Sequence, residues 1–179
     1  MMIMSRKNNS AALLGLLGLA AHEAIKRRND PQTSSADFSG GRRIAGWVVY
    51  ATPEARKLSN DKCGKWMCFF SDFEHAKQIC QKAIDENACA ECKCTDVVAR
   101  GTEDGVICFY ANGDDFDAHK RIIKFMMDNE LIRRTKTGKY YNISFKYDRQ
   151  TQAGEYGALF EGQIKLDKYI DLKTGKFIV

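Results

Sequence analysis

The feature of this chain that most constrains its fold is an ordered series of strand and helix patterns between residues 64 and 147. Apolar residues alternate with polar ones, or run without interruption, in four segments: residues 64–70, 91–98, 106–110 and 140–147. A period of two is typical of strands with one covered face, and an unbroken apolar run is typical of a central strand. Two segments repeat apolar residues at helical spacing: residues 73–84 and 116–127. The order strand, helix, strand, strand, helix, strand predicts an α+β fold with a βαββαβ core.

Local signals predict where these elements begin and what flanks them. Ser71 stands three residues before Glu74, which is the spacing of a capping box, and should open the first helix. The run Asn112-Gly113-Asp114-Asp115 supplies a turn and an N-cap for the second helix. Residues 100–105 are polar and contain glycine, as expected for a hairpin loop. Two more strand patterns should add edge strands at both ends of the sheet: residues 44–51 and 160–166.

The two helices should leave one face of the sheet uncovered. Right-handed crossovers place both helices on the same side of one mainly antiparallel sheet. The polar positions of three strands then share the other, open face: Lys65, Lys93, Thr95, Asn142, Ser144 and Lys146. Three lysines from three strands on one surface form a candidate anion-binding face. The alternative is an ordinary solvated face, on which lysine keeps the sheet soluble and protects its edges.

Several short runs in these strands also point to a family. They are Gly64-Lys65-Trp66, Cys92-Lys93-Cys94-Thr95, the strand of residues 106–110, Phe145-Lys146-Tyr147-Asp148 and Gly154-Glu155-Tyr156-Gly157. In their order and spacing, about half of the chain resembles the family of the basophilic-leukaemia-expressed protein, whose fold is like that of translation initiation factor 4E. The chain departs from that family in its cysteine-rich second strand and in lacking a proline after Lys146.

The resemblance implies a curved sheet with helices on its convex side and a ligand on its concave side or rim. Proteins similar to the initiation factor stack a nucleobase between aromatic rings and neutralise phosphates with lysine and arginine. The aromatic candidates here are Trp47, Tyr50 and Tyr140, whereas alternation directs Trp66 toward the helices as a core residue.

A basic run precedes the last core strand and includes Arg133 and Arg134. If the open face binds a nucleotide, these residues should lie at its rim beside Lys146 and contact phosphate. The alternative is a solvated turn between helix and strand.

Residues 1–43 differ in composition from the rest of the chain. An apolar run at residues 11–21 is flanked by basic residues and is too short to span a bilayer. It predicts a helix over residues 10–28 that binds a partner, mediates self-association or touches a membrane, followed by a flexible linker. The alternative is a helix packed on its own domain or on a neighbouring subunit. Residues 44–179 are long enough for a single α+β domain.

The cysteines and histidines do not form a recognisable reactive site. Cys89, Cys92 and Cys94 cluster, but the second pair that a structural zinc site usually needs is missing, so buried thiols are expected instead. An odd number of cysteines, 7, favours the reducing cytoplasm. His75 and His119 have no nucleophile or carboxylate set near them in the pattern. We therefore expect no metal and no cofactor, and the sequence favours a binding module over an enzyme, which is the third choice.

The chain carries more basic than acidic residues, which bears on its expected partners. An excess of 28 Lys+Arg over 23 Asp+Glu gives a formal net charge of +5, which favours anionic partners. The sequence predicts a non-catalytic module that binds a nucleotide or a short nucleic-acid element on its lysine-bearing face. The alternative is a protein-interaction, adaptor or inhibitor module that acts through that face or through the N-terminal helix.

Overall fold

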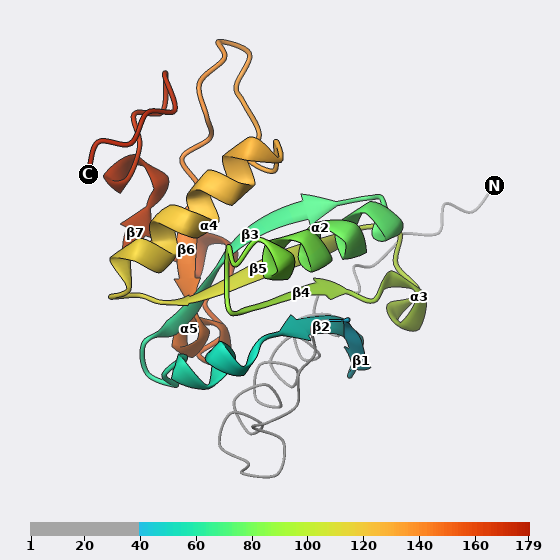
Figure 1. The fold of residues 1–179 in the computed structure, drawn as a ribbon. Coiled ribbons are helices and arrows are strands. Elements are labelled where there is room, and N and C mark those ends of the chain that lie inside the picture. The colour runs from blue at the N-terminus through green and yellow to red at the C-terminus, as the bar shows by residue number, and fades with distance from the viewer. Residues whose placement is uncertain (1–39) are drawn as a thin grey trace, which may run out of the picture.

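The computed structural model describes residues 40–179, which form a single seven-stranded antiparallel sheet with helices packed against it (Figure 1). The helix and linker expected within residues 1–43 therefore lie outside the described residues, except for the last few. The strands follow the spatial order β1-β2-β4-β5-β3-β6-β7. Their bounds are β1 Arg42–Ile44, β2 Trp47–Ala51, β3 Cys63–Phe70, β4 Glu91–Thr95, β5 Gly105–Asn112, β6 Ser144–Tyr147 and β7 Ile164–Lys165. The expected α+β class, antiparallel sheet and short edge strands at both ends are confirmed.

The four central strands and two long helices form the expected βαββαβ core. Helix α2 (Phe73–Asp85) connects β3 to β4, and helix α4 (Phe116–Asp128) connects β5 to β6. Because β5 lies between β3 and β4, and β3 lies between β5 and β6, each crossover skips one strand and the two units interlock. Both helices lie on the same side of the sheet (Figure 1), as the crossover rule predicts.

Side-chain carboxylates begin both helices. The Asp115 side chain accepts a hydrogen bond from the Ala118 N–H and caps α4, as expected. Helix α2 differs from expectation, because Asp72, not Ser71, caps it by accepting a hydrogen bond from the His75 N–H. A short helix, α3 (Val97–Arg100), follows β4 where the sequence pattern suggested a longer strand.

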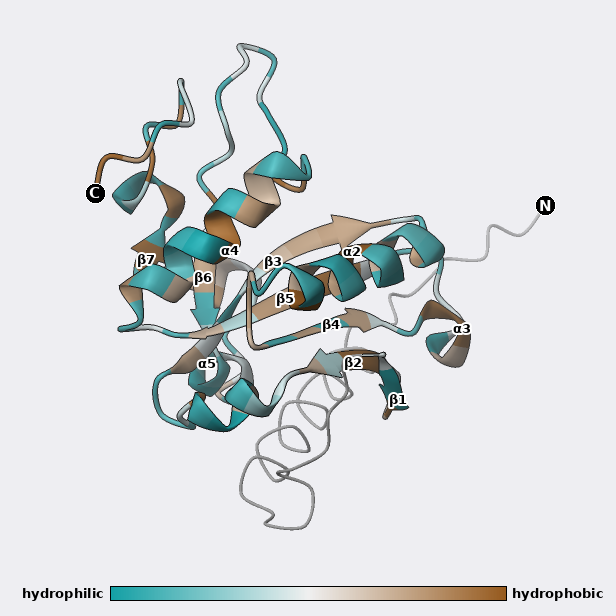
Figure 2. Cartoon of the chain, in the orientation of Figure 1, coloured by the Kyte–Doolittle hydropathy of each residue, from teal (hydrophilic) through white to brown (hydrophobic). Residues whose placement is uncertain are grey.

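The main core lies between the helices and one face of the sheet. Alternate residues of the strands point into it, among them Trp66, Phe109 and Phe145, which are fully buried. The Trp66 Nε1–H donates to His119 Nδ1 at 2.9 Å, so this indole is a core residue, as expected. Colouring by hydropathy shows the same division, with apolar strands beneath helices whose outer faces are polar (Figure 2).

Besides β4, three more predicted strands are shorter than their patterns. The strand predicted over residues 44–51 is a hairpin, because Ala45 and Gly46 have φ of 48° and 77° and turn the chain between β1 and β2. The strand predicted over residues 140–147 begins at Ser144. Before it, the Tyr140 N–H donates to Leu172 O at 2.8 Å and the Tyr141 N–H donates to Arg133 O at 3.0 Å, which directs the chain away from β3. Residues 160–166 contribute the two residues of β7.

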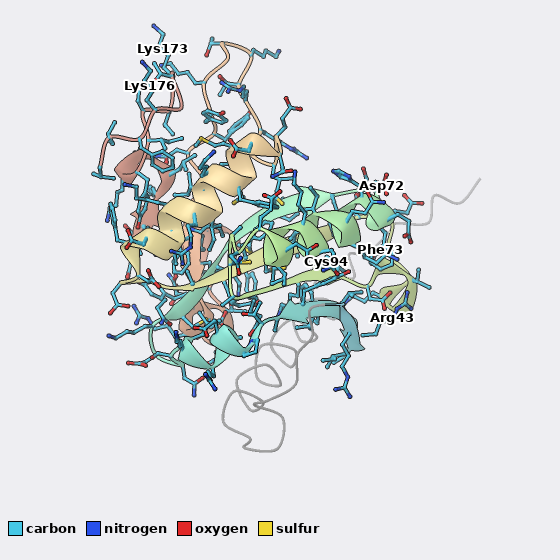
Figure 3. The ribbon with its side chains drawn as sticks, in the orientation of Figure 1. Arg43, Asp72, Phe73, Cys94, Lys173 and Lys176 are labelled. Carbon is cyan, nitrogen blue, oxygen red and sulfur yellow. The ribbon has the colours of Figure 1, made fainter. Side chains whose placement is uncertain are left out.

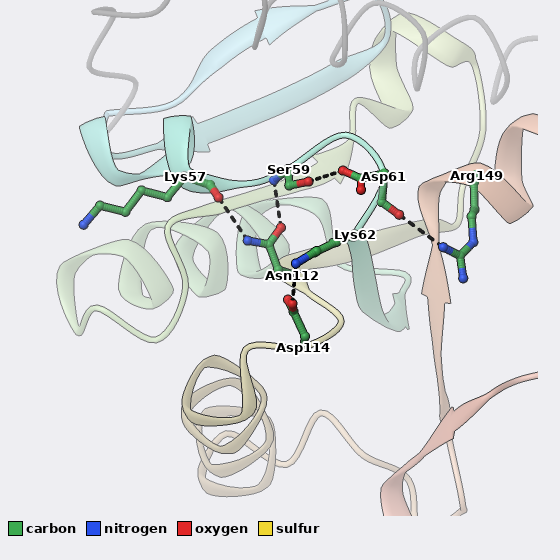
Figure 4. Close-up of polar contacts among 7 residues, drawn as sticks. All are labelled: Lys57, Ser59, Asp61, Lys62, Asn112, Asp114 and Arg149. Atoms are coloured by element: carbon green, nitrogen blue, oxygen red, sulfur yellow. Dashed lines mark hydrogen bonds and ion pairs between the residues drawn. The ribbon is translucent and has the colours of Figure 1, made fainter.

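Polar contacts join the loop before β3 to the end of β5 and to the region after β6 (Figure 4). The Asn112 amide accepts from the Ser59 N–H at 2.8 Å and donates to Lys57 O at 3.0 Å. Arg149, in helix α5 (Asp148–Gln152), donates to Asp61 O at 3.2 Å. These bonds fix α5 and the loop on the side of the sheet opposite α2 and α4.

Candidate functional site

The three lysines selected from the sequence lie together on the sheet face opposite α2 and α4. Lys65 on β3 is directly opposite Lys146 on β6, and it is also opposite Tyr110 on β5. Lys93 on β4 is opposite Cys108, two residues from Tyr110 on the same side of β5. We call this surface, defined by Lys65, Lys93 and Lys146, the lysine face.

The lysine face is not open to solvent at these positions, which corrects the sequence-based expectation. The relative exposures of Lys65, Lys93 and Lys146 are 6%, 5% and 4%. A second apolar cluster lies on the same face and contacts Lys65 and Lys93 through Tyr110 and Trp47, with these buried members: Trp47, Leu58, Cys63, Cys108 and Tyr110. The face therefore holds ammonium groups in an apolar environment, where each charge needs a compensating partner.

Lys65 has such a partner within the chain. Its Nζ lies 2.6 Å from Asp148 Oδ1 and 2.9 Å from Thr151 Oγ1, both on α5. Burial disfavours the charged ammonium, but the Asp148 carboxylate outweighs burial, and the pKa of Lys65 is raised above its ordinary value. Lys65 and Asp148 thus form a buried ion pair that ties α5 to β3.

Lys146 is held by the segment that follows α5. Its Nζ donates to Glu155 O and lies 3.6 Å from the centre of the Tyr156 ring and 5.0 Å from that of Phe160. Burial, together with the charge of Lys65, lowers the pKa of Lys146 to about 8. Near neutral pH this ammonium is charged but close to its titration range.

Lys93 differs from the other two because no oxygen atom of residues 40–179 accepts a hydrogen bond from its ammonium. Its Nζ lies 4.3 Å from the centre of the Trp47 ring and 5.3 Å from that of Tyr110. Burial lowers the pKa of Lys93, and the charge of Lys65 acts in the same direction. The aromatic rings attract the cation but leave its N–H donors unused.

Two further donors on this face also lack partners among the described residues. They are the indole N–H of Trp47 and the hydroxyl of Tyr156, both buried. The guanidinium of Arg100 lies 4.8 Å from the centre of the Trp47 ring and donates to Gly46 O. A face that combines cations with unused N–H and O–H donors is suited to an anion that accepts hydrogen bonds.

The remaining polar residues selected from the sequence are Thr95, Ser144 and Asn142, and they do not all lie on the lysine face. Thr95 is buried on the lysine face, where its hydroxyl accepts from the Val106 N–H at 3.0 Å. Ser144 is half-buried on β6, opposite Lys165. Asn142 precedes β6, and its side chain donates to Asp167 Oδ2 at 2.7 Å, so it belongs to the C-terminal segment and not to the lysine face.

Most of the aromatic and arginine candidates lie on the helix side of the sheet. Trp47 is on the lysine face, whereas Tyr50 and Tyr140 belong to the main core. The Arg134 guanidinium stacks on the Tyr140 ring at 3.8 Å and donates to its hydroxyl at 2.6 Å. Arg133 borders a groove together with residues of α2. The structure therefore does not bring Tyr140, Arg133 or Arg134 to Lys146, because the chain leaves the sheet before Ser144.

Sequence reasoning missed four residues of the site: Arg100, Tyr110, Asp148 and Tyr156. Tyr110 lies within an unbroken apolar run, so periodicity did not assign it to a face. Asp148 directly follows β6, and a carboxylate immediately after a lysine-bearing strand is a signal that could have suggested an ion pair. No strand periodicity places Arg100 or Tyr156 there, since Arg100 ends the short helix α3 and Tyr156 lies in an irregular segment.

All seven cysteines are buried and free, as predicted for small apolar side chains. Burial raises the pKa of Cys68 to about 12 and that of Cys92 well above its ordinary value, so these thiols are protonated. Residues 40–179 contain no group of three or more His, Cys, Asp or Glu side chains that could hold a metal ion.

No family model, curated protein or solved structure matches the chain. In the part of the chain that the structure describes, no helix has both the length and the apolar character needed to cross a bilayer.

Proposed function

We propose that the protein is a non-catalytic binding module that holds a phosphate-bearing ligand, a nucleotide or a short nucleic-acid segment, on the lysine face. The observation that supports this most directly is Lys93, a residue that is 5% exposed as a whole and whose ammonium has no oxygen acceptor within residues 40–179. A buried charge without a hydrogen-bonding partner is costly, and a bound phosphate oxygen would relieve that cost.

The charge balance of the face favours an anion with more than one oxygen acceptor. Asp148 compensates Lys65, so the uncompensated positive charge lies on Lys93 and Lys146. The rings of Trp47, Tyr110 and Tyr156 border these ammonium groups, and aromatic rings beside cations suit a base attached to a phosphate. We also propose that the fold is similar to that of initiation factor 4E. The arrangement of two helices on one side of the sheet and a cationic face on the other supports this proposal.

Entry of a ligand would require a local movement. Tyr156 and Phe160 lie over Lys146, so the segment between Gly154 and Gly162 has to move away for a phosphate to reach that ammonium. Gly154 and Gly157 have φ of 72° and 57°, so the segment already depends on glycine conformations that other residues rarely adopt.

Binding of defined anions tests the proposal. Adenosine and guanosine monophosphate and an oligouridine are titrated into the full chain by calorimetry, with inorganic phosphate as the minimal probe. Lys93→Met should weaken binding by roughly tenfold or more, because a charge-assisted hydrogen bond contributes about 1.5–3 kcal/mol. Lys173→Met is the matched control, since Lys173 is exposed on the C-terminal segment, far from the lysine face (Figure 3). Equal affinity in the wild type and Lys93→Met, or no binding by the wild type, contradicts the proposal.

The affinity for these anions should fall as the pH rises through about 8. The pKa of Lys146 in the free protein is about 8; above it the group is neutral and must take up a proton to bind an anion, which costs up to about tenfold in affinity per pH unit. Lys146→Arg should flatten this dependence, because arginine stays charged. A pH profile that is the same in Lys146→Arg and in the wild type would contradict the assignment.

A further inference from the structure

The edge of β3 is only partly covered in the described part of the chain. All eight residues of β3 pair with β5, but the ladder with β6 consists of Gly64 and Lys65 alone. Continuing that register would place Ile143 opposite Cys68 and Tyr141 opposite Phe70. The chain does not follow this course, because residues 140 and 141 are bonded to Leu172 and Arg133. The arrow end of β3 therefore lies at the margin of the sheet (Figure 1).

Within the described residues, the backbone along this edge has no partner beyond β5. Between Met67 and Phe70, no hydrogen bond to a residue in the 40–179 range is present apart from the ladder with β5. In an antiparallel strand, every second residue directs its N–H and C=O to each side. The margin of β3 thus presents donors and acceptors in the pattern that another extended chain would satisfy.

A groove of about 750 Å³ runs along this margin. Residues from both faces of β3 line it, Met67 and Phe69 from one and Cys68 and Phe70 from the other, so the groove follows the edge of the strand. Its walls come from α2 on one side and from the chain after α4 on the other, and they include Asp72, His75, Ile79, Leu131, Tyr141 and Ile143. Asp72 and Phe73 mark the end of α2 that borders it (Figure 3).

The lining of the groove is mixed: apolar side chains of β3 lie beside polar ones such as Asp72, His75 and Arg133, and two of its aromatic side chains are accessible. Phe69 is 75% exposed and Tyr141 is 52% exposed, values that are unusual for aromatic residues in a sheet margin. Natural sheets usually protect a free margin with charges, proline or a bulge, whereas the sequence here is Met67-Cys68-Phe69-Phe70. Hydropathy colouring shows β3 as apolar up to its arrow end (Figure 2).

We propose that this margin of β3 is a docking site for an extended peptide segment of a partner protein, which adds to the sheet as an antiparallel strand beside Met67–Phe70. Main-chain hydrogen bonds to β3 supply affinity, and apolar side chains at every second peptide residue enter the groove between α2 and Leu131. None of the three lysines lines the groove, although Met67 also packs against the apolar cluster of the lysine face. A free peptide fits better than the same margin of a second copy, because α2 and residues 129–143 flank the groove and would meet their counterparts.

The test uses a synthetic heptapeptide library with valine, isoleucine or phenylalanine at alternate positions and threonine between them. Binding to the full chain is measured by fluorescence anisotropy, and amide hydrogen exchange locates it. We expect binding at micromolar to millimolar peptide concentration and slower exchange within residues 67–70. Phe69→Lys should weaken binding by about tenfold, since an edge lysine opposes strand addition.

Controls separate this result from unfolding and from the anion site. Val98→Lys makes the same change at an apolar residue that is 70% exposed on α3 and should leave peptide binding unchanged, as should Lys93→Met. Thermal midpoints of all variants check that they are folded. Absence of binding up to about 1 mM peptide, or binding without slower exchange at residues 67–70, would overturn the proposal. If amide exchange at residues 67–70 became slower with rising protein concentration in the absence of peptide, the proposal would be overturned in favour of a dimer.

Discussion

Lys65→Met is expected to lower the free energy of unfolding by about 3–5 kcal/mol, because it leaves a buried carboxylate without its cation. The side chains of Lys65 and Asp148 are 7% and 1% exposed, and the ammonium and carboxylate are 2.6 Å apart. The free energy of unfolding is measured by urea denaturation followed by tryptophan fluorescence. The slope of this free energy against urea concentration is compared between variants.

A second ion pair of nearly the same geometry provides the control. Lys62 and Asp114 are 2.7 Å apart, but their side chains are 54% and 61% exposed, so Lys62→Met should lower the free energy of unfolding far less than Lys65→Met does. The double variant Lys65→Met with Asp148→Asn should recover part of the loss, since the amide carries no charge. If Lys62→Met and Lys65→Met lowered the free energy of unfolding by similar amounts, burial would not determine how strongly the Lys65–Asp148 pair stabilises the fold.

Lys93→Met is expected to have the opposite effect and to raise the free energy of unfolding by about 1–3 kcal/mol. Methionine has a similar length and removes a buried charge that has no oxygen acceptor within the described residues, and this gain exceeds the roughly 1–2 kcal/mol of cation–π attraction to Trp47 and Tyr110. The same urea experiment measures it. Residues kept for ligand binding commonly cost stability in this way.

The comparison with Lys173→Met tests whether the gain is specific to Lys93. Lys173 is exposed, so replacing it should change the free energy of unfolding by less than about 0.5 kcal/mol. A loss of stability in Lys93→Met would mean that its ammonium is well compensated in the free protein, and the main support for the anion site would be removed.

Periodicity alone was enough to place Lys65, Lys93 and Lys146 on one face, because a strand exchanges faces at every residue and the three strands are adjacent or nearly so. It could not show that the lysines are buried. Their cover includes α5 and the segment around Tyr156, which are polar or irregular in sequence and have no period from which a position could be inferred.

The error over Tyr140 has a different origin. The alternation from residue 140 to residue 147 is genuine, but half of that pattern packs against the helices and the C-terminal segment instead of pairing with β3. Backbone partners far along the chain, such as Leu172, decided where the strand begins. Single-sequence patterns do not contain this information, and the rim assigned to Arg133 and Arg134 was misplaced for the same reason.

The buried pair between Lys65 and Asp148 also has a consequence for how the protein is made. Its two members are 83 residues apart, and β6, which pairs with β3 beside them, is among the last strands to be synthesised. A nascent chain that has emerged only as far as α4 therefore holds Lys65 without its carboxylate and β3 without any neighbour on one side. Such an intermediate cannot complete its fold on the ribosome until the region around residue 148 emerges, and during that interval it should be a substrate for chaperones.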